Sequence, residues 1–419
     1  MIVDDTVTYR TILKQVIRDI PEAEVVETAV NGRDALEKLN TTPVDMVLLD
    51  VEMPELNGLE TLKCIRQGSF RQVAVVMVSG ANRASANITM ECLQAGALDF
   101  IPKPEGSNMS ESVTLLRDKL VPLFLQQLVE QQKPLLPRQP LYQAQAVQRS
   151  PLFYKADATA PSSQETETVG FASATVSQSA SRSVTTPTPL VKRGGLSPCP
   201  PIERSVVLPR AASPEKPLAP TPGRLPGRID AIAIGVSTGG PRALMELVPA
   251  LSAQLQVPIY IVIHMPPVFT TSLADRLNQM SPLRVVEGAE GMRVEDNTVV
   301  LAPGGHHMVL TRPGVLGLTQ NAPVNSCRPA VDVLFESMAS VYGGNVLSVI
   351  LTGMGSDGAK GVQALKAQGA YCLNQTEGSC VVYGMPRAVD ELGLADEQVD
   401  LAQMASRINT VVNRVNRGR

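Results

Sequence analysis

The sequence is poor in several residues on which particular functions depend. It contains no tryptophan, 3% aromatic residues and three histidines, at positions 264, 306 and 307, so histidine chemistry has few candidates. Its six cysteines, at 64, 92, 199, 327, 372 and 380, form no CxxC pair. In a chain of 419 residues this pattern is typical of reduced cytosolic thiols rather than of a disulfide framework. Neither a signal peptide nor an apolar run of about 18 residues is present, so we expect a cytoplasmic protein that inserts into no membrane.

Net charge and composition exclude further classes of protein. The formal net charge of −3 excludes a strongly basic nucleic-acid binder, and we expect no nucleic-acid partner. Hydrophobic residues make up 44% and charged residues 18%, which excludes a fully disordered or a collagen-like chain. The length predicts two or three domains.

The composition divides the chain into three segments. Residues 1–125 and 229–419 alternate short apolar runs with amphipathic stretches, which predicts two doubly wound α/β domains. Residues 126–228 differ, because the stretch 133–228 alone holds 16 of the 33 prolines among many Ser, Thr, Ala and Gln residues. Such a segment buries too little apolar surface to offset chain entropy, so we predict a flexible linker. We expect the excess of basic residues in this linker only to keep it solvated. The alternative is that these residues weakly attract an acidic partner.

A first group of polar residues follows the predicted strands of the N-terminal segment. Asp4, Asp5, Asp50, Ser79 and Lys103 each come directly after an apolar run. Open α/β sheets place their sites at the carboxyl ends of strands. Clustered carboxylates need a cation, and Mg²⁺ prefers such oxygen ligands, while a lysine and a hydroxyl can hold phosphate oxygens. Asp50 could therefore accept a phosphoryl group, although any one of these acids alone is more typical of a turn or a helix cap.

Taken together, these motifs resemble a bacterial response-regulator receiver domain. The segments VDD, LLDVEMPELNG, VSG and IPKP carry the resemblance, which covers roughly residues 1–120. It implies a flavodoxin-like fold with a five-stranded parallel sheet and phosphorylation at Asp50 by a histidine kinase. It also implies that Ser79, Lys103 and the aromatic Phe100 respond to the phosphoryl group, although Phe100 could simply pack in the core.

The same resemblance implies a magnesium site and a cis peptide. Asp4, Asp5, Asp50 and the backbone carbonyl of Glu52 would form the metal site, and the bond before Pro104 would be cis. Only three residues precede Asp4. A central strand usually has five or six. We therefore suspect that the natural chain begins a few residues earlier.

A second group offers a serine, a histidine and an aspartate at three strand ends. Ser237 lies in GVSTGG, which fits the G-x-S-x-G pattern of a nucleophilic serine on a tight turn. A glycine-rich phosphate cradle is the alternative, and the motif alone leaves both open. His264 ends the run IYIVIH, and Asp357 lies in LTGMGSDGAKG. By themselves they could be a structural histidine and a helix N-cap. The three residue types match a catalytic triad, in a chain order that differs from that of α/β-hydrolases.

The remaining histidines, His306 and His307, are adjacent in LAPGGHHM. Consecutive side chains diverge in extended backbone, so we expect loop or pocket-lining roles and no zinc site.

The C-terminal segment resembles the catalytic domain of the chemotaxis protein-glutamate methylesterases. IGVSTGGPRAL, IHMPPVFTTSLADRLN, LAPGGHHM, PVNSCRPAVDVLFESMA, LTGMGSDGAKG and CVVYGMPRAV carry this resemblance over about residues 229–415. It implies hydrolysis of glutamate γ-methyl esters and deamidation of glutamines on chemoreceptors, regulated by phosphorylation of the receiver. Ser237 would be the nucleophile, His264 the base and Asp357 its partner. Thr238 and Met354 would form the oxyanion site, without any cofactor for the esterase.

Two other functions stay open at this stage. A receiver joined to a domain that only docks on receptors would have no need of a serine, a histidine and an aspartate together. An esterase or amidase acting on a different protein would keep them, and the sequence does not distinguish it from a receptor methylesterase.

Overall fold

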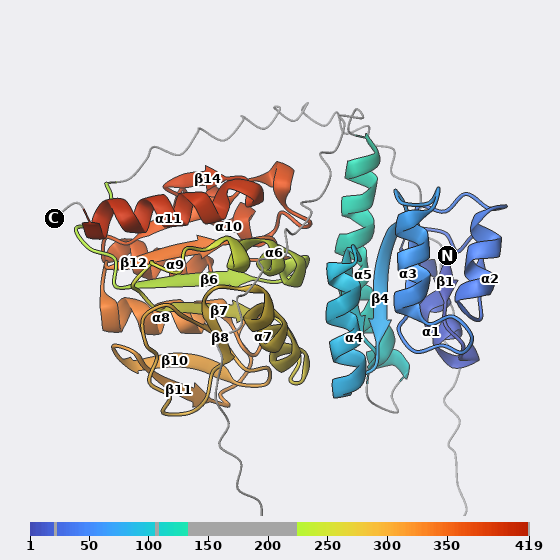
Figure 1. The fold of residues 1–419 in the computed structure, drawn as a ribbon, viewed down its shortest axis with the longest axis horizontal. Coiled ribbons are helices and arrows are strands. Elements are labelled where there is room, and N and C mark those ends of the chain that lie inside the picture. Colours follow the sequence, from blue (N-terminus) through green and yellow to red (C-terminus); the bar gives the residue numbers. More distant parts are fainter. Residues whose placement is uncertain (21–22, 105–108, 133–223, 418–419) are drawn as a thin grey trace, which may run out of the picture. The chain divides into compact units, whose positions relative to one another are not determined.

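The computed structural model describes residues 1–20, 23–104, 109–132 and 224–417 (Figure 1). The predicted linker 126–228 lies largely outside these residues, and its first seven belong to a helix that ends at Gln132. Within the described residues, no helix is both long enough and apolar enough to cross a bilayer.

The N-terminal domain is built on a five-stranded parallel sheet, as the sequence predicted. Its strand order is β2-β1-β3-β4-β5. The strands are β1 (Ile2–Val3), β2 (Thr28–Ala29), β3 (Met46–Asp50), β4 (Ala74–Ser79) and β5 (Asp99–Pro102). The helices are α1 (Val7–Arg18), α2 (Gly32–Leu39), α3 (Gly58–Gln67), α4 (Arg83–Gln94) and α5 (Met109–Gln132).

Asparagine caps set where three of these helices begin. Asn31, Asn57 and Asn82 each accept a backbone N–H of the first helical turn, and Asn57 forms a complete capping box with Glu60. Each of these helices therefore begins a few residues after a strand, so the carboxyl ends of the strands are left free for a site.

One expectation for this domain agrees with the structure and one does not. β1 has two residues, in keeping with the few that precede Asp4, and it pairs with both β2 and β3 in the sheet. The cis peptide among the described residues is Arg328–Pro329, so the prediction of a cis bond before Pro104 is wrong.

The C-terminal domain has a seven-stranded parallel sheet in the order β14-β13-β12-β6-β7-β9-β8, and a separate antiparallel hairpin of β10 and β11. The strands are β6 (Ala231–Val236), β7 (Ile259–Ile263), β8 (Arg284–Glu287), β9 (Thr298–Leu301), β10 (His307–Arg312), β11 (Val315–Thr319), β12 (Val346–Ile350), β13 (Tyr371–Gln375) and β14 (Glu397–Val399). The helices are α6 (Gly240–Leu247), α7 (Phe269–Met280), α8 (Val331–Tyr342), α9 (Ala359–Ala367), α10 (Met385–Glu391) and α11 (Leu401–Arg417), with short 3₁₀ turns at Val248–Ala250 and Glu377–Ser379. The order reverses at β6, which is the place where doubly wound sheets bind ligands.

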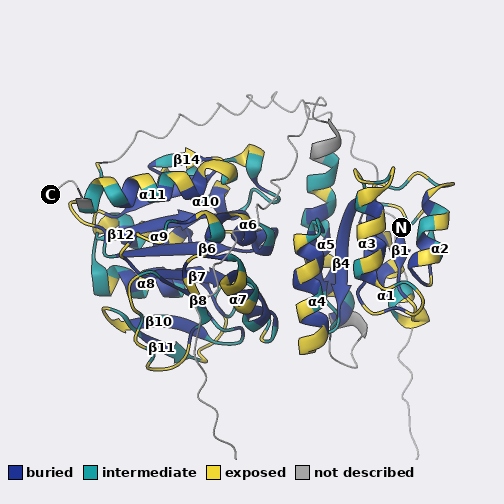
Figure 2. Ribbon diagram, in the orientation of Figure 1, coloured by how far each residue is buried: buried dark blue, intermediate teal, exposed yellow. Residues whose placement is uncertain are grey.

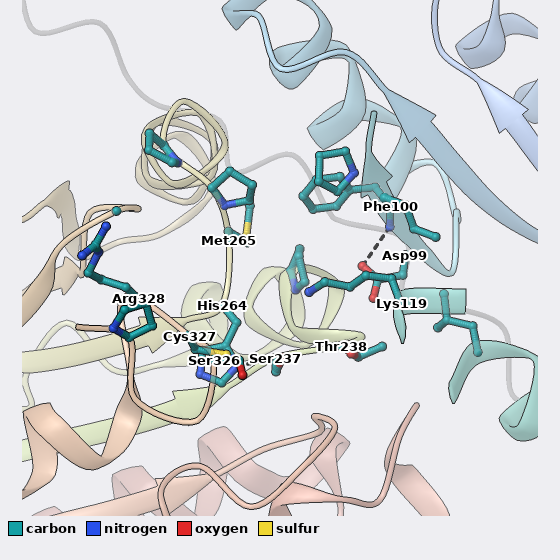
Figure 3. Close-up of a pocket in the computed structure, with 18 residues that line it drawn as sticks. Asp99, Phe100, Lys119, Ser237, Thr238, His264, Met265, Ser326, Cys327 and Arg328 are labelled. Atoms are coloured by element: carbon teal, nitrogen blue, oxygen red, sulfur yellow. Dashed lines mark hydrogen bonds between the residues drawn. The ribbon is translucent and has the colours of Figure 1, made fainter. Parts of the chain in front are cut away.

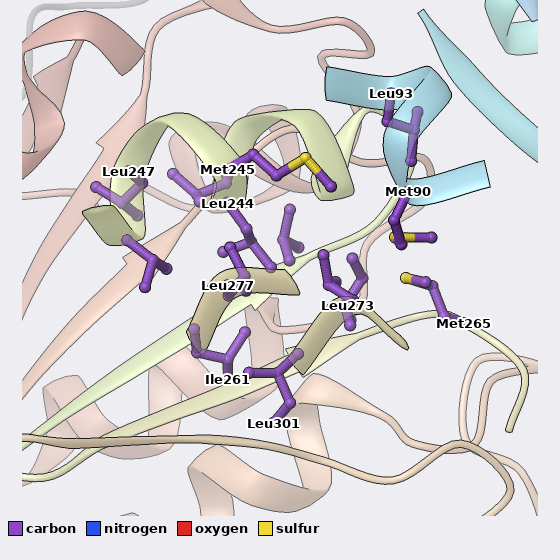
Figure 4. Packing of buried hydrophobic residues seen from close by; sticks show 14 of the residues in the cluster. Met90, Leu93, Leu244, Met245, Leu247, Ile261, Met265, Leu273, Leu277 and Leu301 are labelled. Carbon is purple, nitrogen blue, oxygen red and sulfur yellow. The ribbon is translucent and has the colours of Figure 1, made fainter. Parts of the chain in front are cut away.

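Alternating side chains of β6 enter two hydrophobic layers. Ile232 and Ile234 pack on the side of α6, α7 and α11, whereas Ala231 and Ala233 face α8 and α9. Figure 2 shows the central strands buried while the helices keep exposed outer faces. Figure 4 shows the first layer, where Leu277 lies near Leu244 and Ile261. Burial on both sheet faces is what the near-continuous apolar runs predicted.

We expect this layer to respond strongly to a cavity. Leu277 is fully buried, so Leu277→Ala should lower the free energy of unfolding of the domain by about 2–5 kcal/mol. Leu392→Ala, which removes the same atoms from a side chain that is 56% exposed, should change it by no more than about 0.5 kcal/mol. Denaturant unfolding of both variants tests this. Equal losses would mean that Leu277 does not contribute to the core as described.

Candidate active site

Three neighbouring strands place the serine, the histidine and the aspartate at one edge of the sheet. Ser237 directly follows β6 and His264 directly follows β7, while Asp357 lies in the loop between β12 and α9. Because β6 pairs in parallel with both β7 and β12, the carboxyl ends of the three strands meet. The fold therefore brings the three residues together although 120 positions separate Ser237 from Asp357 in the sequence.

The three side chains form one hydrogen-bonded chain. Ser237 Oγ lies 3.0 Å from His264 Nδ1, and His264 Nε2 lies 2.7 Å from Asp357 Oδ2. All three side chains are buried, and Ser237 and His264 line a pocket with Thr238, Met265 and Cys327 (Figure 3). With Nε2–H donated to Asp357, the Nδ1 lone pair is free to accept the serine proton. This contact favours the nucleophile over the phosphate cradle.

Glycines allow the loops around Ser237 to approach closely. Gly239 has φ +76°, and a Cβ there would lie 2.5 Å from Val381 Cβ. Gly353 lies against the nucleophile itself, since a Cβ there would lie 2.8 Å from Ser237 Cβ. The segments that contain Val381 and Gly353 thus form the walls next to the serine.

Thr352 joins these walls to the nucleophile loop. Its hydroxyl donates to the Thr238 carbonyl at 2.9 Å and accepts the N–H groups of Val381 and Val382. Its own carbonyl accepts the Ser237 N–H at 3.0 Å. This buried residue was not predicted from the sequence, because a threonine after a strand has no distinctive pattern.

Two backbone N–H groups, one next to Ser237 in the chain and one next to Gly353, have no acceptor among the described residues. Within the described residues, neither the Thr238 N–H nor the Met354 N–H donates to an acceptor. Thr238 is buried, whereas Met354 is 47% exposed on a loop held by hydrogen bonds to the Gly353 carbonyl. Two such donors near a nucleophile are what a developing oxyanion needs.

The surroundings of Asp357 and His264 shift both pKa values. Burial would raise the pKa of Asp357, but its bonds to His264 and to the N–H groups of Val331 and Asp332 outweigh burial and hold that pKa below its usual range. Burial would lower the pKa of His264, yet its hydrogen bond to Asp357 and the neighbouring Cys327 outweigh burial and raise that pKa above 6.5. The site thus favours an ionised Asp357 and a strongly basic His264.

Among the described residues, neither of the other two histidines belongs to a group of side chains that could hold a metal ion. The buried His307 donates from Nε2 to the Ala322 carbonyl and accepts the Ala330 N–H at Nδ1. His306 contacts Gln320. Among the described residues, the group of three metal-binding side chains that the structure offers lies in the N-terminal domain.

That group is the predicted acid cluster. Ligand oxygens of Asp4, Asp5 and Asp50 lie within 4.8 Å of one another. Lys103 Nζ lies 2.7 Å from Asp50 Oδ2 and 2.9 Å from Asp4 Oδ2, above the ring of Tyr9. Burial raises the pKa of Asp50 to about 6 despite the hydrogen bond from Lys103. Two buried carboxylates and one exposed carboxylate that repel one another beside a single lysine fit a further divalent metal ion.

The remaining predicted residues of this domain lie around the cluster. Glu52 donates its N–H to Asp50 at 3.4 Å, while its side chain bonds the Ser85 hydroxyl. The buried Ser79 hydroxyl accepts from Thr89, which carries no recognisable pattern in the sequence. Phe100 is buried on β5. These side chains therefore do not join the carboxylate group.

Comparison with known proteins matches both domains. The family model of the response regulator receiver domain matches residues 1–113, and that of the CheB methylesterase matches residues 232–408. A protein-glutamate methylesterase/protein-glutamine glutaminase of Treponema denticola is 35% identical over 412 residues, which cover 98% of this chain and 96% of that protein. The chain belongs to the CheB family.

A second full-length relative and a solved catalytic domain are also similar to this chain. A protein-glutamate methylesterase/protein-glutamine glutaminase from Desulfotalea psychrophila is 33% identical and covers 97% of this chain and 96% of its own length. The crystal structure of the Thermotoga maritima CheB methylesterase catalytic domain is 38% identical, with a TM-score of 0.42. It covers 44% of this chain and 98% of that chain. The two family models and the full-length relatives show that the enzyme is a CheB-type methylesterase and glutaminase with a receiver domain.

We expect the pH dependence of hydrolysis to report His264. A base must be neutral to accept a proton, and the pKa of His264 is raised, so kcat/KM should rise with pH through a midpoint above 6.5. Asp357→Asn should move that midpoint to lower pH and reduce kcat by about 10⁴-fold. Asp296→Asn, at an exposed acid outside the site, should leave the profile unchanged. An unchanged midpoint in Asp357→Asn would contradict the assigned contact.

Proposed function

We propose that the chain removes γ-methyl groups from glutamate esters and ammonia from glutamine side chains of chemoreceptors, through Ser237, His264 and Asp357. The observation that carries this proposal is the continuous chain of contacts of 3.0 Å and 2.7 Å from the serine hydroxyl to the aspartate. Membership of the CheB family supports the substrate class.

One acyl-transfer mechanism serves both reactions. His264 Nδ1 takes the proton of Ser237 while the serine oxygen attacks the side-chain carbonyl carbon. The N–H groups of Thr238 and Met354 stabilise the resulting oxyanion. His264 then returns the proton to the leaving group, which departs as methanol from an ester or as ammonia from an amide. Water, deprotonated by His264, hydrolyses the acyl-serine and leaves a glutamate carboxylate and free Ser237.

Regulation of this activity is assigned to the receiver domain. Asp50 accepts a phosphoryl group from a chemotaxis histidine kinase, and a bound Mg²⁺ would supply positive charge to offset the phosphoryl oxygens. Asp4, Asp5, Asp50 and the carbonyl of Glu52 would hold the ion. Lys103 lies within reach of both Asp50 and Asp4 and would pair with the added phosphoryl charge. Ser79 and Phe100 would respond to the phosphorylated state.

The domain limits follow the same division. We assign residues 1–125 to the receiver, 126–228 to the linker and 229–419 to the catalytic domain, in a protein that acts in the cytoplasm. The esterase needs no cofactor in this scheme. A domain that only docks on receptors would not require three mutually hydrogen-bonded catalytic side chains, and this argues for the enzyme.

Removal of the nucleophile tests the catalytic assignment. Ser237→Ala should lower methanol release from methylated chemoreceptor membranes by at least about 10⁴-fold without lowering the thermal stability of the protein. Ser406→Ala, at an exposed serine of α11, is the matched control and should keep full activity. Full release by Ser237→Ala would mean that another group is the nucleophile. No release by the wild-type enzyme would point to docking or to a different protein ester.

Removal of the phosphoryl acceptor tests the regulation. Asp50→Asn should abolish the increase in methanol release that a small phosphodonor and Mg²⁺ produce in the wild type, because an amide cannot accept the phosphoryl group. Its basal release should persist. Asp19→Asn, at the opposite end of α1 from the acid cluster, should respond like the wild type. Equal stimulation of Asp50→Asn would contradict the assigned acceptor.

A further inference from the structure

The segment PVNSCRPAVDV contains a buried acid that the mechanism above does not use. Asp332 is the second residue of α8 and is 3% exposed. Its Oδ1 accepts the N–H of Gly358 at 2.9 Å and the N–H of Gly361 at 2.8 Å. Both donors belong to the beginning of α9, so Asp332, a residue of one helix, caps the N-terminus of another.

Asp357 makes the converse contacts. It lies just before α9, yet its carboxylate accepts the N–H groups of Val331 and Asp332, which begin α8, at 2.7 Å and 3.1 Å. Asp357 thus caps α8, the helix that carries Asp332, and Asp332 caps α9, the helix that follows Asp357. The positive ends of two helix dipoles converge on two buried negative charges, which offsets part of the cost of burying them.

A single amide lies between the two carboxylates. Asn325 Nδ2 lies 3.0 Å from Asp357 Oδ1 and 3.0 Å from Asp332 Oδ2. An amide nitrogen has two hydrogens, so both are used, one on each carboxylate. Asn325 has φ +51°, in a turn closed by mutual hydrogen bonds between Val324 and Cys327. This left-handed conformation, which asparagine tolerates better than most residues, directs the amide inward.

These contacts leave Asp357 one orientation. Its Oδ1 accepts from Asn325, Asp332 and Gly358, while its Oδ2 accepts from Val331 and from His264. Rotation of the carboxylate would break several of these bonds at once. Among the described residues, the titratable groups that most affect His264 are Asp357 and Cys327, and Asp332 is linked to Asp357 through the Asn325 amide and its own N–H.

We propose that Asn325 and Asp332 are positioning residues for the hydrolysis. They hold Oδ2 of Asp357 toward His264 Nε2, and so keep His264 Nδ1 directed at Ser237. The inference rests on the proposed triad mechanism. It differs from a purely structural role, in which loss of the caps would reduce the amount of folded enzyme and leave the chemistry of His264 unchanged.

Asn325→Gly tests the inference, because glycine keeps the left-handed backbone and removes only the amide. We expect kcat to fall by about tenfold or more with KM unchanged, since substrate contacts remain. Asn297→Gly is the matched control, because Asn297 also has a left-handed φ of +59° but bonds Gln256 away from the site. It should retain wild-type kcat and pH dependence.

NMR titration supplies a readout that a structural role would not move. The chain has three histidines, so the ring signals of His264 can be assigned with His264→Gln as reference. In Asn325→Gly we expect a lower pKa for His264 and a weaker low-field Nε2–H signal, because the imidazolium loses a well-oriented partner. The acid limb of kcat/KM should shift to lower pH by the same amount.

Asp332→Asn provides a second variant that keeps an acceptor for the α9 N–H groups but removes one negative charge. It should also lower the pKa of His264 and kcat. If Asn325→Gly and Asp332→Asn both fold and both keep the wild-type His264 titration and pH profile, the inference is overturned, whatever their specific activity. If the wild-type enzyme itself releases no methanol while His264 still titrates as described, the proposed substrate fails and the positioning inference stands.

Discussion

The parallel pairing of β6 with β7 on one side and β12 on the other is the constraint on which the catalytic half of this CheB-family protein depends. The register aligns Val236 with Ile263 and Gly235 with Ile350, so the three strands end at the same level. Ser237 and His264 are the next residues on their strands. Asp357 reaches the same edge through the loop that leads into α9. The backbone hydrogen bonds of the sheet therefore place the catalytic residues near one another, and side-chain contacts then orient them.

The two halves of the protein stabilise buried carboxylates in different ways. In the receiver domain, Asp4 and Asp50 share the charge of Lys103, and Asp5 remains exposed beside them. Such a cluster is electrostatically incomplete, which suits a site that binds a metal ion and a phosphoryl group. In the catalytic domain, Asp357 and Asp332 are saturated by backbone N–H groups and one amide. A saturated carboxylate does not attract ions and keeps a fixed orientation, which suits catalysis.

Close backbone approach makes both arrangements possible. A Cβ at Gly58 would lie 2.2 Å from the Asp50 carbonyl, and one at Gly353 would collide with Ser237. Glycines thus occur where a loop passes directly over a functional residue, and the G-rich motifs of the sequence have this steric cause. The Thr352 hydroxyl then fastens the segments that the glycines allow to meet.

The sequence by itself determined the two α/β domains, the acids that follow the first strands, and the serine, histidine and aspartate of the second domain. These features are local, because an apolar run followed by a polar residue marks the end of a buried strand wherever it occurs. Tertiary structure alone decided which nitrogen of His264 faces Ser237 and that Asp357 caps α8. It also decided the contributions of Thr352, Asn325 and Asp332, and it placed the Glu52 side chain on Ser85. These contacts join segments far apart in the chain through single hydrogen bonds, which have no periodicity or spacing in the sequence by which they could be recognised.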